Sequence, residues 1–207
     1  MAKPAWLKDR IALLAWPKDA LLHRVHPDCY AAGQFNPGVR GNARFSQIKH
    51  ADGHPIPTLY AGTTLDCALM ETVFHDVPFV PGLKTVDESK LAQLVHSRLI
   101  VRQALTLVDL RNVALRKLGF RRTELIDTEK DLYPQTRAFA ERVHAECPDA
   151  QGLCWMSRQD DSARAVMLFG DRIAAGVLMP HGPGRGLGDE AKAEVVDLAE
   201  RIGVCLV

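Results

Sequence analysis

The 207-residue chain has no long hydrophobic run: no stretch reaches the roughly 18 apolar residues that a membrane-spanning helix needs. Its apolar N-terminal stretch is interrupted by Lys8, Asp9 and Arg10, which does not fit a signal peptide. The five cysteines contain no C-x-x-C pair, which argues against a disulfide framework and a structural zinc site. We therefore expect a cytoplasmic protein that does not associate with a membrane.

An excess of charge of one sign is also missing. The 26 Lys and Arg residues nearly cancel the 25 Asp and Glu residues, which leaves a formal net charge of +1. Such a chain offers no strong field to nucleic acid or anionic lipid, and an RNA-cleaving enzyme would need a basic, aromatic-rich face. We expect no direct nucleic-acid binding. The 47% of hydrophobic residues instead suits one compact domain with a sizeable core.

Motifs for metals and nucleotide cofactors are not found either. His23 and His26 would point to opposite faces of a predicted strand, and His50 and His54 lie in a Gly/Pro-rich loop without an H-E-x-x-H helix. No G-x-G-x-x-G follows a strand, and the sequence GPGRGLG lacks the lysine–serine pair of a P-loop. We expect no metal site and no resident cofactor.

The apolar periodicity predicts helices and strands without a regular βαβ alternation, which indicates an α+β fold with a mixed sheet and flanking helices. The predicted helices span 4–15, 65–75, 111–118, 133–147 and 189–201. The predicted strands span 21–26, 58–62, 94–101, 105–110, 152–157, 164–169 and 173–178, with a short one around residue 44.

The C-terminal part is predicted to be distinct. Four glycines within 181–190 indicate a flexible linker, so we divide the chain into a compact domain, 1–180, and a linker with a final amphipathic helix, 181–207. The apolar face of that helix either completes its own domain or forms a contact surface for another molecule.

One carboxylate stands out, because Glu71 lies in the middle of the largely apolar helix predicted at 65–75. Asp66 is explained by the helix N-terminus, where Thr63-x-x-Asp66 resembles a capping box, but Glu71 has no such explanation. A buried carboxylate is costly unless it is paired. Glu71 is therefore an ion-pair partner of a buried arginine, an exposed residue at the helix edge, or a functional anion.

Four other residues are candidates for ligand contacts. Arg24 lies within the apolar strand LLHRVH and Arg44 ends a glycine-rich loop; each is a surface arginine, a partner of Glu71, or a bidentate phosphate ligand. Tyr60 precedes Ala61 and Gly62 at the end of a predicted strand, and it is either a core residue or a ring that stacks on a ligand. Ser157 ends another strand, where serine either forms a turn or donates to a ligand. It has no G-x-S-x-G context, so we reject a serine-hydrolase nucleophile.

The segments LLHRVH, GNARFS, IPTLYAGTTLDCALMETVFHDV and GLCWMSR occur in the order typical of the RES domain family, so the chain resembles that family from about residue 20 to about residue 178. The match includes Arg24, Arg44, Glu71 and Ser157. The family often has a tyrosine before its first arginine, where this chain has His23.

The resemblance implies a fold similar to ADP-ribosyltransferases and NAD⁺ as the substrate, cleaved at the nicotinamide–ribose bond. It also implies a toxin that pairs with a helix-turn-helix antitoxin, in a homodimer or a larger toxin–antitoxin complex. Inorganic phosphate is the co-substrate in one reading of the family, and a protein side chain is the acceptor in another. A shell that binds its partner without turning over NAD⁺ is the non-enzymatic alternative.

The chemistry is compatible with these residues. Nicotinamide leaves NAD⁺ as a neutral group, so the reaction needs no general acid, unlike ordinary glycoside hydrolysis with its two carboxylates. A single anion facing the developing oxocarbenium is enough, which gives Glu71 a role. Arg24 and Arg44 would bind the pyrophosphate or the attacking phosphate, Tyr60 would stack on nicotinamide or ribose, and Ser157 would donate a hydrogen bond.

Overall fold

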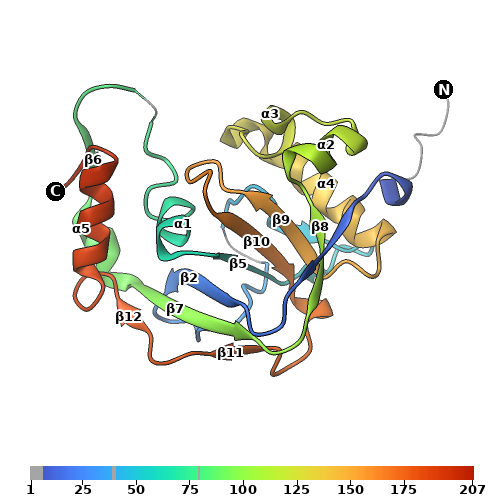
Figure 1. The fold of residues 1–207 in the computed structure, drawn as a ribbon, viewed down its shortest axis with the longest axis horizontal. Helices are drawn as coiled ribbons and strands as arrows, with labels where there is room; N and C mark the ends of the chain where they lie inside the picture. The colour runs from blue at the N-terminus through green and yellow to red at the C-terminus, as the bar shows by residue number, and fades with distance from the viewer. Residues whose placement is uncertain (1–6, 39–40, 79) are drawn as a thin grey trace.

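A curled nine-stranded sheet forms the centre of the protein in a computed structural model that describes residues 7–38, 41–78 and 80–207 (Figure 1). The strands follow one another across the sheet in the order β1 (Leu13–Trp16), β8 (Leu105–Asp109), β9 (Gly152–Met156), β10 (Arg164–Phe169), β5 (Thr58–Gly62), β2 (Leu21–Pro27), β7 (Leu94–Val101) and β11 (Leu178–Pro180). A ninth strand, β12 (Arg185–Gly186), pairs with β7 beside β11. Only β8 and β9 run parallel within this sheet, so the sheet is mixed, as the sequence predicted.

Helices and two small sheets surround the main sheet. The helices are α1 (Leu65–Met70), α2 (Asn112–Leu118), α3 (Arg122–Leu125), α4 (Tyr133–Glu146) and α5 (Lys192–Arg201). Short 3₁₀ turns are η1 (Leu7–Asp9), η2 (Glu88–Gln93), η3 (Lys130–Leu132) and η4 (Gly170–Arg172). The small sheets pair β3 (Ile48–Lys49) with β4 (Pro55–Ile56), and β6 (Lys84–Val86) with β13 (Val204–Leu206). The α+β class predicted from the sequence is confirmed.

Both faces of the central strands are buried, which explains their continuous apolar sequences. On β10, Met167 and Phe169 enter a core beneath α2, α3 and α4, whereas Val166 and Leu168 enter a second core on the opposite face. This alternation is the period-two pattern of a strand. A third core lies between α1 and α5 and holds Leu69 and Val195.

Three predicted elements differ from the structure besides helix α1, whose ends are described with the candidate site. The described part of the helix predicted at 4–15 is the turn η1 followed by strand β1, because β1 pairs with β8 over four residues; residues 4–6 lie outside the described ranges. The strand predicted around residue 44 is reduced to one bridge, between Ala43 and Ser46. The strand predicted at 173–178 begins only at Leu178, after a turn in which Gly176 has a φ of 82°.

The C-terminal segment packs onto the rest of the chain. The glycine-rich residues predicted as a flexible linker hydrogen-bond to β7, through β12 and through the amide of Leu187, 2.9 Å from the carbonyl oxygen of Leu94. Helix α5 buries Val195 and Leu198 against its own domain. The contact-surface interpretation of this apolar face is therefore wrong. No helix within the described ranges is long and apolar enough to cross a membrane.

Candidate active site

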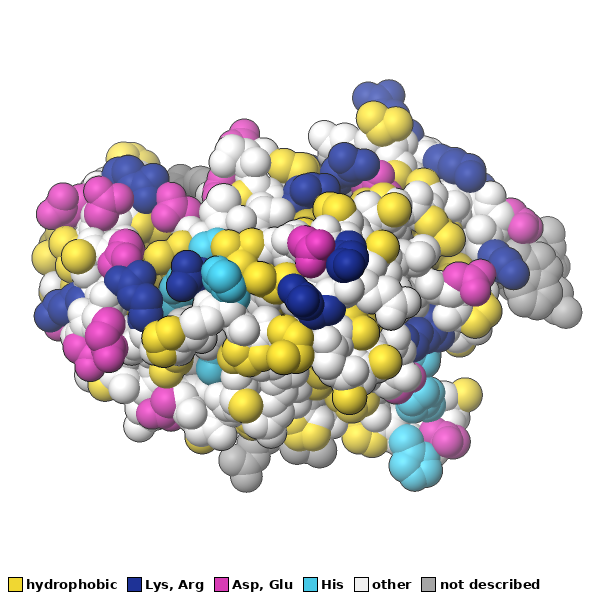
Figure 2. Space-filling view, turned by 60° about the horizontal axis from the view of Figure 1, so that its bottom comes forward, with side chains coloured by type: hydrophobic (Ala, Val, Ile, Leu, Met, Phe, Trp, Pro, Cys, Tyr) yellow, Lys and Arg dark blue, Asp and Glu magenta, His cyan; other side chains and the backbone are white. Residues whose placement is uncertain are grey.

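A cleft of about 380 Å³ opens between the ends of β2 and β5, the end of α1, and the start of α4. Its volume lies within the range of small-molecule sites. The residues predicted from the sequence that line it are Arg24, Arg44, Tyr60 and Glu71. On the face shown in Figure 2, basic and acidic side chains are interspersed, without a continuous basic surface. The cleft, which collects four of the residues predicted from the sequence, is therefore the candidate site.

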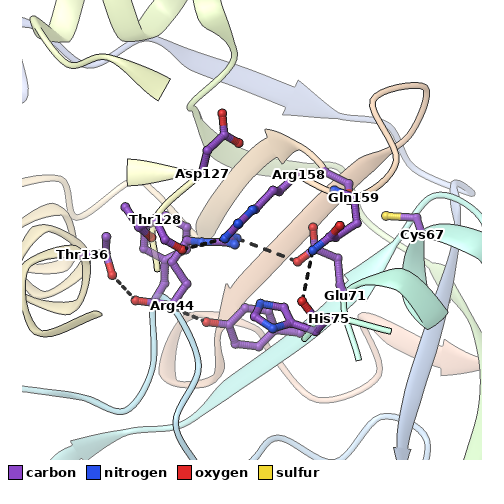
Figure 3. Close-up of polar contacts among 12 residues, drawn as sticks. Arg44, Cys67, Glu71, His75, Asp127, Thr128, Thr136, Arg158 and Gln159 are labelled. Atoms are coloured by element: carbon purple, nitrogen blue, oxygen red, sulfur yellow. Dashed lines mark hydrogen bonds and ion pairs between the residues drawn. The ribbon is translucent and has the colours of Figure 1, made fainter. Parts of the chain in front are cut away.

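Glu71 reaches the cleft because α1 is shorter than predicted. The helix ends at Met70, and Glu71 is its C-cap residue. The Thr72 hydroxyl donates to the carbonyl of Ala68, and the Phe74 amide donates to that of Leu69 at 3.0 Å, so these groups take carbonyls that a longer helix would use. The turn aims the Glu71 side chain, 14% exposed, into the cleft instead of leaving it on a helix face (Figure 3).

The start of α1 also differs from the prediction. Thr64, not Thr63, caps the helix, and its hydroxyl accepts a hydrogen bond from the Cys67 amide at 3.0 Å. The Thr63 hydroxyl instead accepts from the Arg164 amide on β10 at 3.0 Å. This contact fixes the turn between β5 and α1, and hence the direction in which α1 delivers Glu71.

Arg44 lies opposite Glu71 and is 3% exposed. The loop that carries it is held by α4, because the Thr136 hydroxyl donates to the Arg44 carbonyl (Figure 3). One guanidinium nitrogen, Nη1, lies 3.8 Å from Oε2 of Glu71, which is an ion pair without a hydrogen bond. Within the described residues, Nε and Nη2 of Arg44 and Oε1 of Glu71 are buried and have no hydrogen-bond partner.

These orphaned atoms are the unusual feature of the site. Buried polar atoms are nearly always hydrogen-bonded, because an unpaired one costs about 1–3 kcal/mol and a charged one costs more. A purely structural ion pair would be expected to satisfy its donors and acceptors through close contact. The Arg44–Glu71 pair thus leaves two donor atoms and one acceptor atom unpartnered among the described residues at the wall of the cleft.

Tyr60 supports the Arg44 loop from β5. Its hydroxyl accepts a hydrogen bond from the Phe45 amide at 3.0 Å, and its ring packs edge-on against Trp155 with the centroids 6.2 Å apart. Burial raises the pKa of Tyr60 to about 12, so the phenol is neutral at physiological pH. The hydroxyl thus positions the loop, and the predicted stacking on a ligand stays a prediction.

Arg24 enters the cleft from the middle of β2 and is 6% exposed. Its Nη1 donates to the carbonyl oxygen of Ala32 at 2.6 Å and more weakly to that of Ala31 at 3.4 Å. Burial lowers the pKa of Arg24 to about 10, so it remains a cation at neutral pH. Arg24 therefore holds the 31–32 loop and contributes positive charge to the cleft.

Comparisons with known proteins show the family and the fold of this chain. The family model of the RES domain matches residues 21–186, which is most of the chain. The chain belongs to the RES domain family. A crystal structure of the M. tuberculosis MbcT–MbcA toxin–antitoxin complex contains a similar fold, with a TM-score of 0.64, 14% identity, and coverage of 90% of this chain and 94% of that chain. A comparison with curated protein sequences finds no match.

Ser157 is the one predicted site residue of this RES domain that does not line the cleft. Its side chain is 0% exposed, and its hydroxyl accepts hydrogen bonds from the amides of Gln159 and Asp160, each at 3.1 Å. These are the bonds of a serine turn. The turn directs Gln159 toward the site, where its amide nitrogen donates to the carbonyl of His75 at 3.0 Å (Figure 3). Ser157 thus forms the turn that places Gln159, and its predicted hydrogen bond to a ligand stays a prediction.

The RES domain also contains polar residues at the mouth of the cleft that the sequence analysis did not assign to the site. Tyr133 contacts Nε2 of His75 through its hydroxyl at 3.2 Å, Nδ1 of His75 lies 2.9 Å from Asp76, and Lys130 donates to Asp76 at 2.7 Å. The hydrogen bond from Lys130 is the main reason why the pKa of Asp76 is lowered. Lys130 and Tyr133 follow Asp76 by more than 50 residues, so no local pattern could have joined them.

Proposed function

We propose that this RES domain protein is the toxin of a toxin–antitoxin system, and that it cleaves the nicotinamide–ribose bond of NAD⁺ and transfers ADP-ribose to inorganic phosphate. The observation that carries the proposal is the Arg44–Glu71 pair, 3.8 Å apart in a cleft and with three buried polar atoms unpartnered among the described residues. The Glu71 carboxylate suits the positive charge that develops on the ribose, and the Arg44 guanidinium suits the negatively charged phosphate groups.

Glu71 is assigned to the ribose. Oε1 would accept a hydrogen bond from a ribose hydroxyl, and the carboxylate would face the positive charge that develops as the C–N bond breaks. The electron pair of that bond returns to the pyridinium nitrogen, so nicotinamide leaves neutral and needs no proton. The other carboxylate at the cleft, Asp76, is engaged by Lys130 and His75 at the mouth, so the proposed chemistry uses Glu71 alone, unlike that of a conventional glycosidase.

Arg44 is assigned to phosphate oxygens through Nε and Nη2, which form one edge of the guanidinium fork and suit bidentate binding. The same position would hold either the pyrophosphate of NAD⁺ or the attacking phosphate. In phosphorolysis, an oxygen of phosphate forms the new bond to the ribose carbon from which nicotinamide departs. Arg24 adds a second cation to the same cleft.

The proposed partner follows from the comparison with solved structures. The structural neighbour was solved as a toxin–antitoxin complex, which supports an antitoxin as the partner of this chain. We further propose, from the family resemblance, that this antitoxin is a helix-turn-helix protein and that the assembly is a homodimer or a larger toxin–antitoxin complex. The enzyme would act in the cytoplasm, where NAD⁺ and phosphate are available.

The test is to follow nicotinamide release from NAD⁺ by the purified protein, with and without phosphate, and to identify the products by mass spectrometry. Phosphate-dependent release with ADP-ribose phosphate as product is the expected result. Release of nicotinamide without phosphate, with free ADP-ribose as the product, would show that the reaction is hydrolysis and not phosphorolysis. Release that requires an added protein, with label incorporated into that protein, would indicate a mono-ADP-ribosyltransferase. If nicotinamide is not released under any of these conditions, the result would favour a non-catalytic binding module.

A further inference from the structure

Three metal-ligating side chains converge outside the cleft. His50 comes from the β3–β4 hairpin, His144 from the last turn of α4, and Asp171 from the turn η4 after β10. One ligand atom from each lies within 4.8 Å of the other two. Nε2 of His144 is 2.8 Å from Oδ2 of Asp171, and Nε2 of His50 is 3.7 Å from the same oxygen. The sequence gives no hint of this cluster, because its members are separated by 94 and 27 residues (144 − 50; 171 − 144).

The structure separates the histidine pair that the sequence analysis considered for chelation. His54 turns toward Asp52 on the exposed tip of the hairpin, with Nδ1 3.1 Å from Oδ2, and both side chains are exposed. His50 turns the other way, toward His144, and their rings meet edge-on with centroids 5.0 Å apart. The sequence-based argument against His50 and His54 as a pair therefore does not apply to His50 in its actual surroundings.

We propose that His50, His144 and Asp171 bind a divalent transition-metal ion, with Zn²⁺ as the best match to two imidazoles and one carboxylate. Zinc takes these ligands at about 2.0–2.2 Å, so tetrahedral ligands stand about 3.3 Å apart. The observed separations of 2.8 and 3.7 Å bracket that value. The His50 side chain is 37% exposed and has room to close the remaining separation to His144. A water molecule would complete the coordination.

The surroundings favour a fixed site. The His144 side chain is 8% exposed, and its ring packs edge-on against Phe169 with centroids 5.0 Å apart. The nearby cation, Arg172, has its guanidinium engaged by carbonyl oxygens at the end of α4, including those of Cys147 at 2.7 Å and Ala150 at 2.6 Å. Those carbonyls hold the arginine, while Asp171 remains hydrogen-bonded only to His144 among the described residues.

The proposed ion would tie together three separate segments. The hairpin already packs on α4 through the buried side chains of Ile48 and Ile56, which share a core with Val143, and a hydrogen bond runs from the Lys49 amide to Glu141 at 2.9 Å. The loop bearing Arg44 precedes β3 directly and is held to the other end of α4 by Thr136. A metal at His50 and His144 would therefore stabilise the scaffold that carries Arg44. Its role would be structural, and independent of the reaction in the cleft.

The experiment is a calorimetric titration of the chelator-treated full chain with Zn²⁺, in a Cys29→Ser/Cys205→Ser background because exposed free thiols are soft ligands that can compete for zinc. One site per chain is expected, together with a higher melting temperature in Zn²⁺. His50→Gln and Asp171→Asn should each weaken binding at least about tenfold, since even the loss of an outer-shell partner costs about 10–100-fold. His54→Gln, on the same hairpin, is the matched control and should bind as the parent does.

A second readout is independent of stability. Replacing Zn²⁺ with Co²⁺ should give the visible absorption of a four-coordinate nitrogen and oxygen site, and His50→Gln should abolish it. The proposal is overturned if the parent binds Zn²⁺ no more tightly than about 1 mM. It is equally overturned if His50→Gln and Asp171→Asn retain the parent affinity, or if His54→Gln loses as much affinity as they do.

Discussion

Replacing Glu71 with glutamine removes one negative charge from the cleft while preserving the size of the side chain and its capacity to accept a hydrogen bond. Two interpretations of the Arg44–Glu71 pair predict different results. If the pair is structural, breaking it leaves a buried arginine uncompensated and costs about 3–5 kcal/mol of stability. If Glu71 is the anion that stabilises the oxocarbenium, the main loss is in the rate of NAD⁺ cleavage.

The geometry favours a small effect on stability. At 3.8 Å and an effective dielectric constant of about 20, the attraction between the two charges is about 4 kcal/mol. Removing the Glu71 charge also removes its desolvation penalty, which is several kcal/mol for a buried ion. Because the two contributions oppose each other and no hydrogen bond is lost between the partners, we expect the free energy of unfolding to change by less than about 2 kcal/mol.

The assay pairs thermal unfolding with single-turnover release of nicotinamide. A change below about 2 kcal/mol shifts the melting temperature of a chain of this size by less than about 8 °C. Removal of one electrostatic stabiliser should lower the cleavage rate by about 10²–10³-fold, with NAD⁺ binding retained. A fall in melting temperature beyond about 12 °C with near-parent turnover would refute the catalytic assignment and establish a structural pair.

Glu146→Gln provides a matched control. Glu146 is 18% exposed, close to the 14% of Glu71, but accepts hydrogen bonds from Nε of Arg142 at 2.6 Å and from the Leu7 amide at 2.9 Å. It does not line the cleft. The substitution should lower stability without changing the rate of nicotinamide release, which separates loss of an ion pair from loss of a catalytic charge.

Further substitutions test the other cleft residues and the pH response. Arg44→Lys should weaken NAD⁺ binding by about 1.5–3 kcal/mol in calorimetry, with little change in melting temperature, because lysine keeps the charge but not the fork; unchanged affinity would reject the phosphate role. Arg24→Lys should lower the melting temperature as well, since Arg24 also holds the 31–32 loop. Tyr60→Phe should cost about 1–3 kcal/mol in urea unfolding, because it leaves a loop amide without its acceptor. Burial lowers the pKa of His96 from 6.5 to about 4, and that of the stacked His23 is lowered too. The unfolded chain therefore takes up protons first as the pH falls, so stability should decrease from about pH 6.5 to about pH 4, by at most about 3 kcal/mol for His96; His96→Gln should flatten this slope.

Local sequence predicted the strands that form the centre of the sheet. Residues 58–62 and 164–169 are short apolar runs bounded by turns. Both faces of these strands are buried, so nearly every position is apolar and the run is recognisable from the sequence. The prediction failed where a distant partner decides the conformation. Residues 13–16 have a pattern that also fits a helix, and pairing with β8, about 90 residues away, makes them a strand.

The position of Glu71 shows a second kind of failure. Apolar periodicity continues through Val73 and Phe74, so the sequence predicts a helix to residue 75. The helix stops five residues earlier because the Thr72 hydroxyl and the Phe74 amide compete for its carbonyls. Apolar periodicity indicates which side chains are buried. Phe74 is buried in the turn that the structure shows, and a helix continuing to residue 75 would bury it as well. Apolar periodicity does not indicate which groups donate to the carbonyls at the end of α1. Those donors decide where the helix ends and therefore where Glu71 points.

The two arginines illustrate what residue type leaves undetermined. Arg24 and Arg44 were assigned the same role for the same reason, and both are buried in the same cleft. In the structure, Arg24 donates to loop carbonyls, whereas Nε and Nη2 of Arg44 have no partner among the described residues. A guanidinium supplies five donors wherever it lies, so its identity fixes the chemistry that it can perform. The number of those donors that the fold itself consumes then separates Arg24, which holds a loop, from Arg44, whose remaining donors we propose bind phosphate.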